Sequence, residues 1–566
     1  MVTGGSSGGV AAVGGAGIAG ATAGRAAAAG AGGTGQSVIP VGVAGASGAS
    51  GQPAAGTPAG ASGAPAVAGS TAAGSGGSAG SAPPAPTGNA SVLEYHKNPS
   101  RDGHYIDAAF TRTAAAALKK DPSFAVELGA DTYAQPLYFE GGPDGKDLLI
   151  TATEANVISA HNAADGAMVW TKTLAPPVTG GLPCGNISPL GVTGTPVIDA
   201  ASRTLYAAAM TSGPKHQVFA LALDTGEIKP GFPVDVSSVT SNGQSFNPAE
   251  HNQRGALVIV GGNVFVPYGG HYGDCGGYHG WVIGVPLAGG APTAWATDAH
   301  AGGIWAPGGL ASDGTSVFAS TGNTMSDAGG IFSTPGSWGH GNAILRLSPS
   351  LGPIAESATA DFFTPNNWEA LDQGDLDLGG SGPVIIEVPG ATPTKYAVAL
   401  GKSGDAWLVG LQSLGGMGGE LGAKKVASGG IGGGMIQAAA AYTTAAGSFV
   451  AFRAVQTVQG CGGGTSGYLG ALKIGAGSPP TFEVAWCAGG TGVGSPIVTT
   501  TDGTNDSIVW YMARGSLLGF NGDTGEEVFA GGGSGDSFGT IAKFQTPIVA
   551  KGRIFLATRD GVIAYT

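Results

Sequence analysis

Charged side chains are scarce in this sequence, and their scarcity excludes several kinds of protein. Asp, Glu, Lys and Arg make up 11% of the 566 residues, and the formal net charge is −13. No cluster of Lys and Arg offers a surface for nucleic acid or for an anionic membrane. No apolar run reaches the ~18 residues of a membrane-spanning helix, so the sequence predicts no transmembrane segment.

Residues 1–92 lack most of what a folded domain needs. They are mainly Gly, Ala, Ser, Thr, Val and Pro, and Arg25 is the only charged side chain before Glu94. A segment of this composition cannot bury enough apolar surface to fold, which predicts a disordered tether. Tethers of this kind are typical of exported surface proteins, although no basic region followed by an apolar stretch marks an export signal here. A leader without function on an unexported protein is the alternative.

What the sequence does contain is a repeat. Residues 160–170 and 519–529 share a small residue, an Asn two places later, an Asp/Gly turn, and an aromatic residue four places after the Gly. Residues 220–226 are a third, weaker copy. A strand, a tight turn and a second strand with a packed aromatic residue form the edge of a small antiparallel sheet. Copies at a fixed period indicate a propeller or a solenoid.

Short anchors containing Pro or Gly mark the repeating units. They recur at intervals of about 50 to 75 residues, and apolar runs follow each of them. The first unit has four such runs, at 134–139, 148–153, 157–160 and 168–174. We therefore predict an all-β fold, an eight-bladed propeller of four-stranded antiparallel blades over residues 93–566. The eight anchors are Gln135-Pro136, Thr195-Pro196, Arg254-Gly255, Gly308-Gly309, Gly382-Pro383, Gln437-Ala438, Ser495-Pro496 and Thr546-Pro547.

The last unit is one strand short. It has strand-like runs at 546–549, 554–558 and 562–565, where the sequence ends, and a lone strand-like run at 123–128 precedes the first unit. We predict that residues 123–128 supply the outer strand of the eighth blade, which closes the ring and leaves no open sheet edge.

The four cysteines fall in loops of one face. In a four-stranded blade the loops after the second and fourth strands emerge on the same side, and all four cysteines lie in such loops. Four cysteines allow three pairings, and only Cys184–Cys275 with Cys461–Cys487 joins neighbours throughout. We predict these two disulfides and an extracellular or periplasmic location. Four unrelated buried thiols are the alternative.

The same loops are long and polar, so we expect the functional site on their face. Two groups have side chains of metal-ligand type: His271, Asp274 and His279, and Asp372, Asp375 and Asp377. The first group suits a transition metal but matches no standard zinc spacing, and ordinary polar loop contacts are the alternative. The second suits calcium but lacks the EF-hand pattern, and an Asp/Gly-rich turn is the alternative.

A cation follows the second strand in each of the last four blades. These cations are Lys402, Arg453, Arg514 and Arg559. In a chain so poor in Lys and Arg, their clustering indicates a site for an anionic ligand, which Arg254 could join from the start of an innermost strand. Solvated charges at strand ends are the alternative.

Several stretches resemble exported bacterial quinoprotein-like propellers, the PQQ-repeat proteins. The stretches are 133–138, 151–170, 184–198, 251–255, 278–281 and 375–378. The family ranges from PQQ-dependent alcohol and sugar dehydrogenases to scaffold lipoproteins of outer-membrane assembly that bind no cofactor. The resemblance therefore implies the fold without choosing a function.

The family's dehydrogenases hold a planar tricarboxylate quinone against a Trp, ligate calcium at the quinone, and use an Asp as base. The resemblance implies Trp305 or Trp368 as the stacking residue, Arg254 as a carboxylate partner, and Asp375 as a base or calcium ligand. The adjacent cysteine pair of the alcohol enzymes is absent here, as is the C-x-x-C-H motif that attaches a c-type haem.

We expect an exported, tethered and monomeric propeller that binds a small anionic ligand or a protein on its long-loop face. The alternative is a PQQ- and calcium-dependent dehydrogenase of an alcohol or sugar, and a lyase or hydrolase in the central funnel is a third possibility. A binding module predicts polar residues scattered around the rim. A dehydrogenase predicts that Trp, Arg and Asp converge on the axis.

Overall fold

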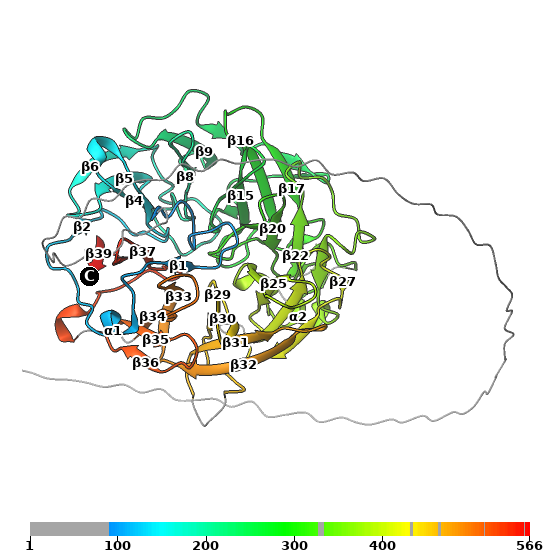
Figure 1. Ribbon diagram of the computed structural model, residues 1–566. Helices are drawn as coiled ribbons and strands as arrows, with labels where there is room; N and C mark the ends of the chain where they lie inside the picture. Colours follow the sequence, from blue (N-terminus) through cyan, green and yellow to red (C-terminus); the bar gives the residue numbers. More distant parts are fainter. Residues whose placement is uncertain are drawn as a thin grey trace, which may run out of the picture. The chain divides into compact units, whose positions relative to one another are not determined.

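The computed structural model describes residues 90–326, 333–334, 336–430, 434–461, 466–513, 515–531, 533–559 and 561–566. The described residues form the eight blades of a β-propeller, arranged as a ring (Figure 1). Each blade is an antiparallel sheet whose strands follow one another from the axis outward. The predicted fold is confirmed. The predicted tether, up to residue 89, and Arg514 lie outside the described residues.

The first four blades follow the chain in order. Blade 1 contains β3 (Leu137–Phe139), β4 (Leu148–Ala152), β5 (Val157–Asn162) and β6 (Met168–Thr173). Blade 2 contains β7 (Val197–Asp199), β8 (Thr204–Thr211), β9 (Lys215–Ala222) and β10 (Val234–Asp235). Blade 3 contains β14 (Val258–Val260), β15 (Asn263–Gly270), β16 (Trp281–Pro286) and β17 (Thr293–Ala296), with β13 (His251–Asn252) also on β15. Blade 4 contains β19 (Ala311–Ser312), β20 (Val317–Ser320), β22 (Ile344–Leu347) and β23 (Phe362–Thr364), with β27 (Gly416–Met417) beside β23.

The last four blades complete the ring. Blade 5 contains β24 (Val384–Glu387), β25 (Lys395–Leu400), β26 (Asp405–Gly410) and β28 (Gly422–Lys425). Blade 6 contains β29 (Ala440–Thr444), β30 (Gly447–Arg453), β31 (Leu469–Gly475) and β32 (Thr481–Ala488). Blade 7 contains β33 (Gly492–Thr500), β34 (Ile508–Ala513), β35 (Ser516–Asn521) and β36 (Glu527–Phe529), with β1 (His104–Ile106) parallel to β33. Blade 8 contains β37 (Ile548–Ala550), β38 (Arg553–Ala557), β39 (Gly561–Tyr565) and β2 (Val126–Glu127).

Short elements occupy the connections between strands. They are the pairs β11 (Thr240–Ser241) with β12 (Gln244–Ser245) and β18 (His300–Ala301) with β21 (Thr324–Met325), the α-helices α1 (Arg112–Ala115) and α2 (Trp368–Gln373), and the 3-10 turns η1 (Pro143–Gly145), η2 (Leu378–Gly380) and η4 (Ser534–Asp536). No helix among the described residues is long and apolar enough to cross a bilayer.

The ring closes as the sequence predicts. Val126 and Glu127 of β2 pair with Val562 and Gly561 of β39, so an N-terminal strand is the outer strand of the last blade. Both predicted disulfides, Cys184–Cys275 and Cys461–Cys487, also form, and no cysteine is left free.

The Asp/Gly turns of the sequence repeat accept a tryptophan from the preceding blade at two junctions, between blades 1 and 2 and between blades 6 and 7. Trp170, at the aromatic position of one copy, donates its Nε1–H to Leu223 O in blade 2 (2.8 Å), and Trp486 of blade 6 donates to Gly522 O in blade 7 (2.7 Å). The indole of Trp170 lies over Gly226 of the neighbouring Asp-Thr-Gly turn, where a Cβ atom would come within 2.5 Å of the ring. The repeat is therefore a docking device between blades.

An N-terminal segment that the sequence did not predict as structured fills the axis. Residues 92–103 hydrogen-bond to innermost strands around the ring (Figure 1, blue). Main-chain bonds join them to Tyr138, Ile198, Ser312, Ile385, Ala441 and Val498, in blades 1, 2, 4, 5, 6 and 7. Arg101 donates to Leu257 O, next to blade 3, and to Leu310 O, and it pairs with buried Glu94 at 2.8 Å. We call residues 92–103 the axial segment.

Candidate functional site

A cavity of about 440 Å³ lies among the long loops at one face of the ring. Its lining comes from segments that follow the second strand of a blade or precede its first strand. The lining residues are Arg254, Gly270, His271, Tyr272, Gly273, Asp274, Tyr278, Gly303, Trp305, Asn323, Thr324, Met325, Asp372, Asp375, Asp377, Lys402, Ile436, Lys543 and Phe544. Most of them belong to blades 3, 4 and 5 and to the loops that join these blades.

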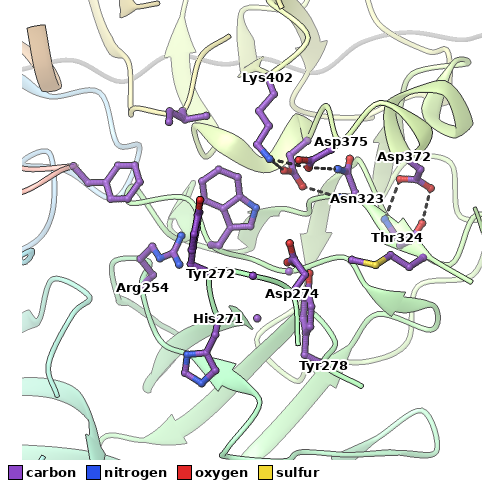
Figure 2. Close-up of a pocket in the computed structure, with 18 of the residues that line it drawn as sticks. Arg254, His271, Tyr272, Asp274, Tyr278, Asn323, Thr324, Asp372, Asp375 and Lys402 are labelled. Carbon is purple, nitrogen blue, oxygen red and sulfur yellow. Dashed lines mark hydrogen bonds and ion pairs between the residues drawn. The ribbon is translucent and has the colours of Figure 1, made fainter. Parts of the chain in front are cut away.

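Lys402 lies between two aspartates at one wall of the cavity (Figure 2). Its Nζ is 2.9 Å from Asp375 Oδ1 and also contacts Asp377 Oδ2. Asn323 holds the same pair, because its Nδ2 donates to Asp375 Oδ1 (3.0 Å) and its backbone N–H donates to Asp377 Oδ1 (2.7 Å). Lys402, Asp375, Asp377 and Asn323 therefore fix one another in place.

The surroundings of Asp375 make its carboxylate more basic than that of an ordinary Asp. Burial raises the pKa of Asp375, and Asp377 raises it further, while Lys402 opposes both. Burial lowers the pKa of Lys402, but Asp377 and Asp375 together outweigh burial, so the net pKa is raised and the amine stays charged. The Asp375 side chain is 30% exposed and that of Asp377 only 9%, so Asp375 is the one open to a ligand.

Asp372 supports the wall from behind. It accepts hydrogen bonds from the backbone N–H of Thr324 (2.9 Å), from the Thr324 hydroxyl (2.8 Å) and from Asn342 Nδ2 (2.7 Å). Burial raises the pKa of Asp372 to about 7 in spite of these bonds. Because its oxygens are taken by Thr324 and Asn342, Asp372 positions the loop of Asn323.

The indole of Trp305 forms an aromatic wall of the cavity, and two cations lie near its ring. Arg254 Cζ lies 5.7 Å and Lys402 Nζ 5.5 Å from the centroid of its ring. Lys543 faces the same space: burial lowers its pKa, and the nearby charges of Arg254, Arg453 and Lys402 lower it further. Among the described residues, neither Arg254 nor Lys543 forms a salt bridge.

The opposite wall is a short arch, residues 271–275. His271 Nε2 donates to Ala249 O (3.1 Å), and Asp274 accepts from the Tyr278 hydroxyl (2.7 Å). The Cys184–Cys275 disulfide ties the arch to blade 2. His279 does not line the cavity, and its ring nitrogen Nδ1 contacts Thr297 O instead (3.0 Å). The group predicted as transition-metal ligands, His271, Asp274 and His279, is thus divided between two environments.

The predicted calcium ligands do meet at the cavity but do not form a metal site as they stand. Lys402 occupies the position between Asp375 and Asp377, and Asp372 is bound by Thr324 and Asn342. Throughout the described part of the chain, no three His, Cys, Asp or Glu side chains converge in a way that could hold a metal ion. A calcium ion here would have to displace the Lys402 amine, so the residues in this arrangement do not fit the metal.

The other predicted ligand-binding residues divide as well. Trp368 packs in the hydrophobic core of blades 3 and 4, so of the two predicted stacking residues Trp305 is the one that lines the cavity. Arg453 and Arg559 do not line the cavity, and Arg559 pairs with Asp131 at 3.4 Å. Arg514 lies outside the described residues. The predicted arc of cations therefore contributes only Lys402 to the cavity lining, together with Arg254.

Sequence reasoning missed Lys543, Phe544 and Tyr272. Lys543 and Phe544 precede the first strand of blade 8, where the sequence shows only an ordinary loop. The signal that could have found them is their position, because Arg254, Trp305 and Ile436 also precede the first strands of their blades. Phe544 also has φ of 79°, a left-handed conformation that is rare for a large side chain.

Solved structures with a similar fold were found, although the sequence itself matches no known family. No family model and no curated protein matches the sequence. The quinohemoprotein alcohol dehydrogenase of Comamonas testosteroni superposes with a TM-score of 0.59 at 13% identity, covering 84% of this chain and 80% of that one. This likeness shows a shared propeller fold. A europium-containing methanol dehydrogenase superposes with a TM-score of 0.56, also at 13% identity, covering 84% of this chain and 91% of that one.

Proposed function

We propose that this propeller binds a planar, polyanionic quinone of the PQQ class and oxidises an alcohol or sugar hydroxyl. The observation that carries the proposal is the convergence of Trp305, Arg254, Lys402 and Asp375 on one cavity. A dehydrogenase predicts that convergence, whereas a pure binding module predicts scattered polar residues. The likeness of fold to quinoprotein dehydrogenases supports the same choice.

The cavity suits an anionic ring. Burial lowers the pKa of Lys543, and the nearby charges of Arg254, Arg453 and Lys402 lower it further; the carboxylates of a bound ligand would relieve that repulsion. The indole of Trp305 offers a face on which a flat conjugated ring can stack. Four aspartates also line the cavity, but Lys402 pairs with two of them and balances one of their two charges, and burial raises the pKa of Asp372 and Asp274.

In the proposed reaction the chain supplies a base and an orienting cation. A bound quinone would accept the hydride that leaves the carbinol carbon, and the substrate would become a carbonyl compound. Asp375 takes the hydroxyl proton, since its raised pKa makes it a stronger base than an isolated Asp. Lys402 and Asn323 hold Asp375 in place for that transfer. No step is assigned to calcium.

Titration calorimetry of the full chain with PQQ, followed by a dye-reduction screen of alcohols and sugars, tests the proposal. We expect one equivalent to bind and turnover to follow. Arg254→Met should weaken binding by about 10- to 100-fold, because a charged hydrogen bond to a carboxylate is lost. Arg559→Met is the matched control, since that cation lies outside the cavity, and it should leave binding unchanged.

Each failure has its own meaning. Absence of PQQ binding at tens of micromolar would overturn the proposal. Tight binding without turnover would return the protein to the class of ligand-binding propellers. Calcium and lanthanide ions added to the same titration test the metal prediction, and a tightening of more than about tenfold would show that a metal takes part in binding.

We further propose that the protein works outside the cytoplasm, tethered through the segment that precedes residue 90; the predicted tether bound of residue 92 is too long, because Val92 is buried and pairs with Tyr138. Cys184–Cys275 joins two loops, whereas Cys461–Cys487 joins a loop to strand β32, where Cys487 lies in the strand and not in the predicted loop; such bonds persist in oxidising compartments. Thiol titration of protein purified without reductant should find no free thiol before reduction and four after it. Free thiols in the unreduced protein would contradict this location.

A further inference from the structure

Tyr272 lines the cavity without packing against the rest of the molecule. Its side chain is 68% exposed, the highest value among the exposed large apolar and aromatic residues of the described chain. Figure 2 shows it on the arch, between Arg254 and Asp274. Among the described residues it makes no ring contact with another aromatic side chain. An aromatic ring exposed at a cavity mouth has a free face to offer a ligand.

The backbone that carries this ring is held on both sides. His271, directly before it, bonds Ala249 O, and Asp274 bonds the Tyr278 hydroxyl. Cys275 is fixed to Cys184 with a Cα–Cα distance of 6.0 Å, and Gly273 passes so close to Cys184 that a Cβ atom would lie 3.4 Å from its sulfur. The arch therefore places Tyr272 at the cavity, while the side chain itself keeps its rotational freedom.

Space lies on both sides of the Tyr272 ring. Tyr272 and His271 line the main cavity and also a small second hollow with Leu182, Ile187 and Leu190, from the loop that Cys184 anchors. The two spaces are unequal: the second hollow, at about 10 Å³, has room for no more than one water molecule, so the open side of the ring is the main cavity. A side chain placed in this way can close on a ligand that enters the main cavity.

We propose that Tyr272 and Trp305 form an aromatic clamp, in which the disulfide-anchored tyrosine covers the face of a planar ligand that Trp305 leaves open. The proposal rests on the proposed function, because it assigns a further contact to the same ligand. The cations bind the edge of the ring, and the two aromatic residues bind its faces. The ligand class is a flat conjugated ring that carries several carboxylates.

The test compares a flat polyanion with one that has no ring. In the oxidised full-length chain, Tyr272→Ala should weaken PQQ binding about tenfold, while Tyr272→Phe should stay within about twofold of the wild type. Citrate, a tricarboxylate without a flat ring, should bind Tyr272→Ala as well as it binds the wild type. Arg254→Met should weaken the binding of both ligands. The melting temperature should not change, because the tyrosine is exposed.

The anchoring is tested by removing the disulfide. A Cys184→Ser/Cys275→Ser variant should lose most of the affinity that Tyr272→Ala loses, and adding Tyr272→Ala to it should cost little more. If wild-type protein binds PQQ and Tyr272→Ala binds it equally well, the clamp is overturned and the proposed function stands. If wild-type protein binds no PQQ, the proposed function and the clamp fail together.

Discussion

Single side chains decide what the cavity can do, and Asp375 is the most consequential of them. In PQQ-loaded protein we expect Asp375→Asn to lower turnover by at least about 100-fold, because the amide cannot take the hydroxyl proton. Quinone affinity should change little, since Asn keeps the shape of the side chain. Dye reduction under saturating substrate measures the first effect and calorimetry the second.

Asp144→Asn is the matched control for this substitution. Asp144 lies on a turn away from the cavity, and its side chain is 85% exposed. Turnover should remain at the wild-type rate. Normal turnover by Asp375→Asn would remove the base from the proposed reaction and leave only a structural role for its pairing with Lys402.

Buried histidines set the acid limit of the fold. Burial lowers the pKa of His216 to about 4 and that of His251 to about 3. In the unfolded chain both titrate near 6.5, so the unfolded state binds more protons than the native state between these pH values. The free energy of unfolding should therefore fall as the pH is lowered from about 6.5 towards 4, by about 1 kcal/mol per pH unit for each histidine.

Urea unfolding at a series of pH values measures this slope. His216→Gln keeps a side-chain donor for His251 O but removes the titration, so its curve should be flatter than that of the wild type. An unchanged slope in the variant would show that other groups dominate the acid response.

At the scale of elements, the contact of Trp170 with the Gly226 turn of the next blade can be tested for its contribution to stability. Gly226→Ala should destabilise the protein in two ways, through its φ of +71° and through the Cβ atom pressed against Trp170. Gly145→Ala shares the φ of +71° but meets nothing within 4 Å, so it measures the backbone cost alone. We expect Gly226→Ala to lose about 1–3 kcal/mol more than Gly145→Ala in denaturant unfolding. Equal losses would show that the Trp170 contact adds nothing to stability.

The sequence predicted the strands, their repeat and the disulfides more completely than it predicted the site. The copies at 160–170 and 519–529 indicated a repeat fold, the eight anchors gave its period, and the missing strand of the last unit located its replacement at 123–128. The disulfides followed from the blade layout, because loops on one face bring cysteines together. Patterns of this kind are local, and a repeated local pattern defines a repeated fold.

The site was less accessible from the sequence, since it depends on which loops meet. Lys402 was expected among four cations, but Arg453 and Arg559 do not line the cavity, and Arg559 pairs with Asp131. Trp305 and Trp368 could not be ranked, because one loop reaches the cavity and the other turns into the core. The axial segment had no periodicity to reveal it, since its partners are single carbonyl and amide groups from separate blades.

At the scale of the whole molecule, Arg101 joins blades that share no strand. Its guanidinium reaches carbonyl groups of Leu257 and Leu310 and the buried carboxylate of Glu94. Arg101→Ala leaves that carboxylate unpaired, so we expect a loss of about 3–5 kcal/mol in the free energy of unfolding.

Arg112→Ala is the comparison, because Arg112 pairs with Asp523 at the surface, where its side chain is 34% exposed. We expect that substitution to cost about 0–1 kcal/mol. Both are measured by denaturant unfolding at one pH. Similar losses for the two variants would show that the axial segment is not a hub of the ring.

The axial segment also has a consequence for synthesis. Its residues leave the ribosome before any blade, yet His96 contacts Thr546, 450 positions later, and Tyr95 contacts Ser495, 400 positions later. Contacts so distant in the chain form late, because the intervening polymer must first be ordered. Every shorter nascent chain leaves this segment without part of its partners and accessible to proteases. The last two blades thus determine when the axial segment becomes protected.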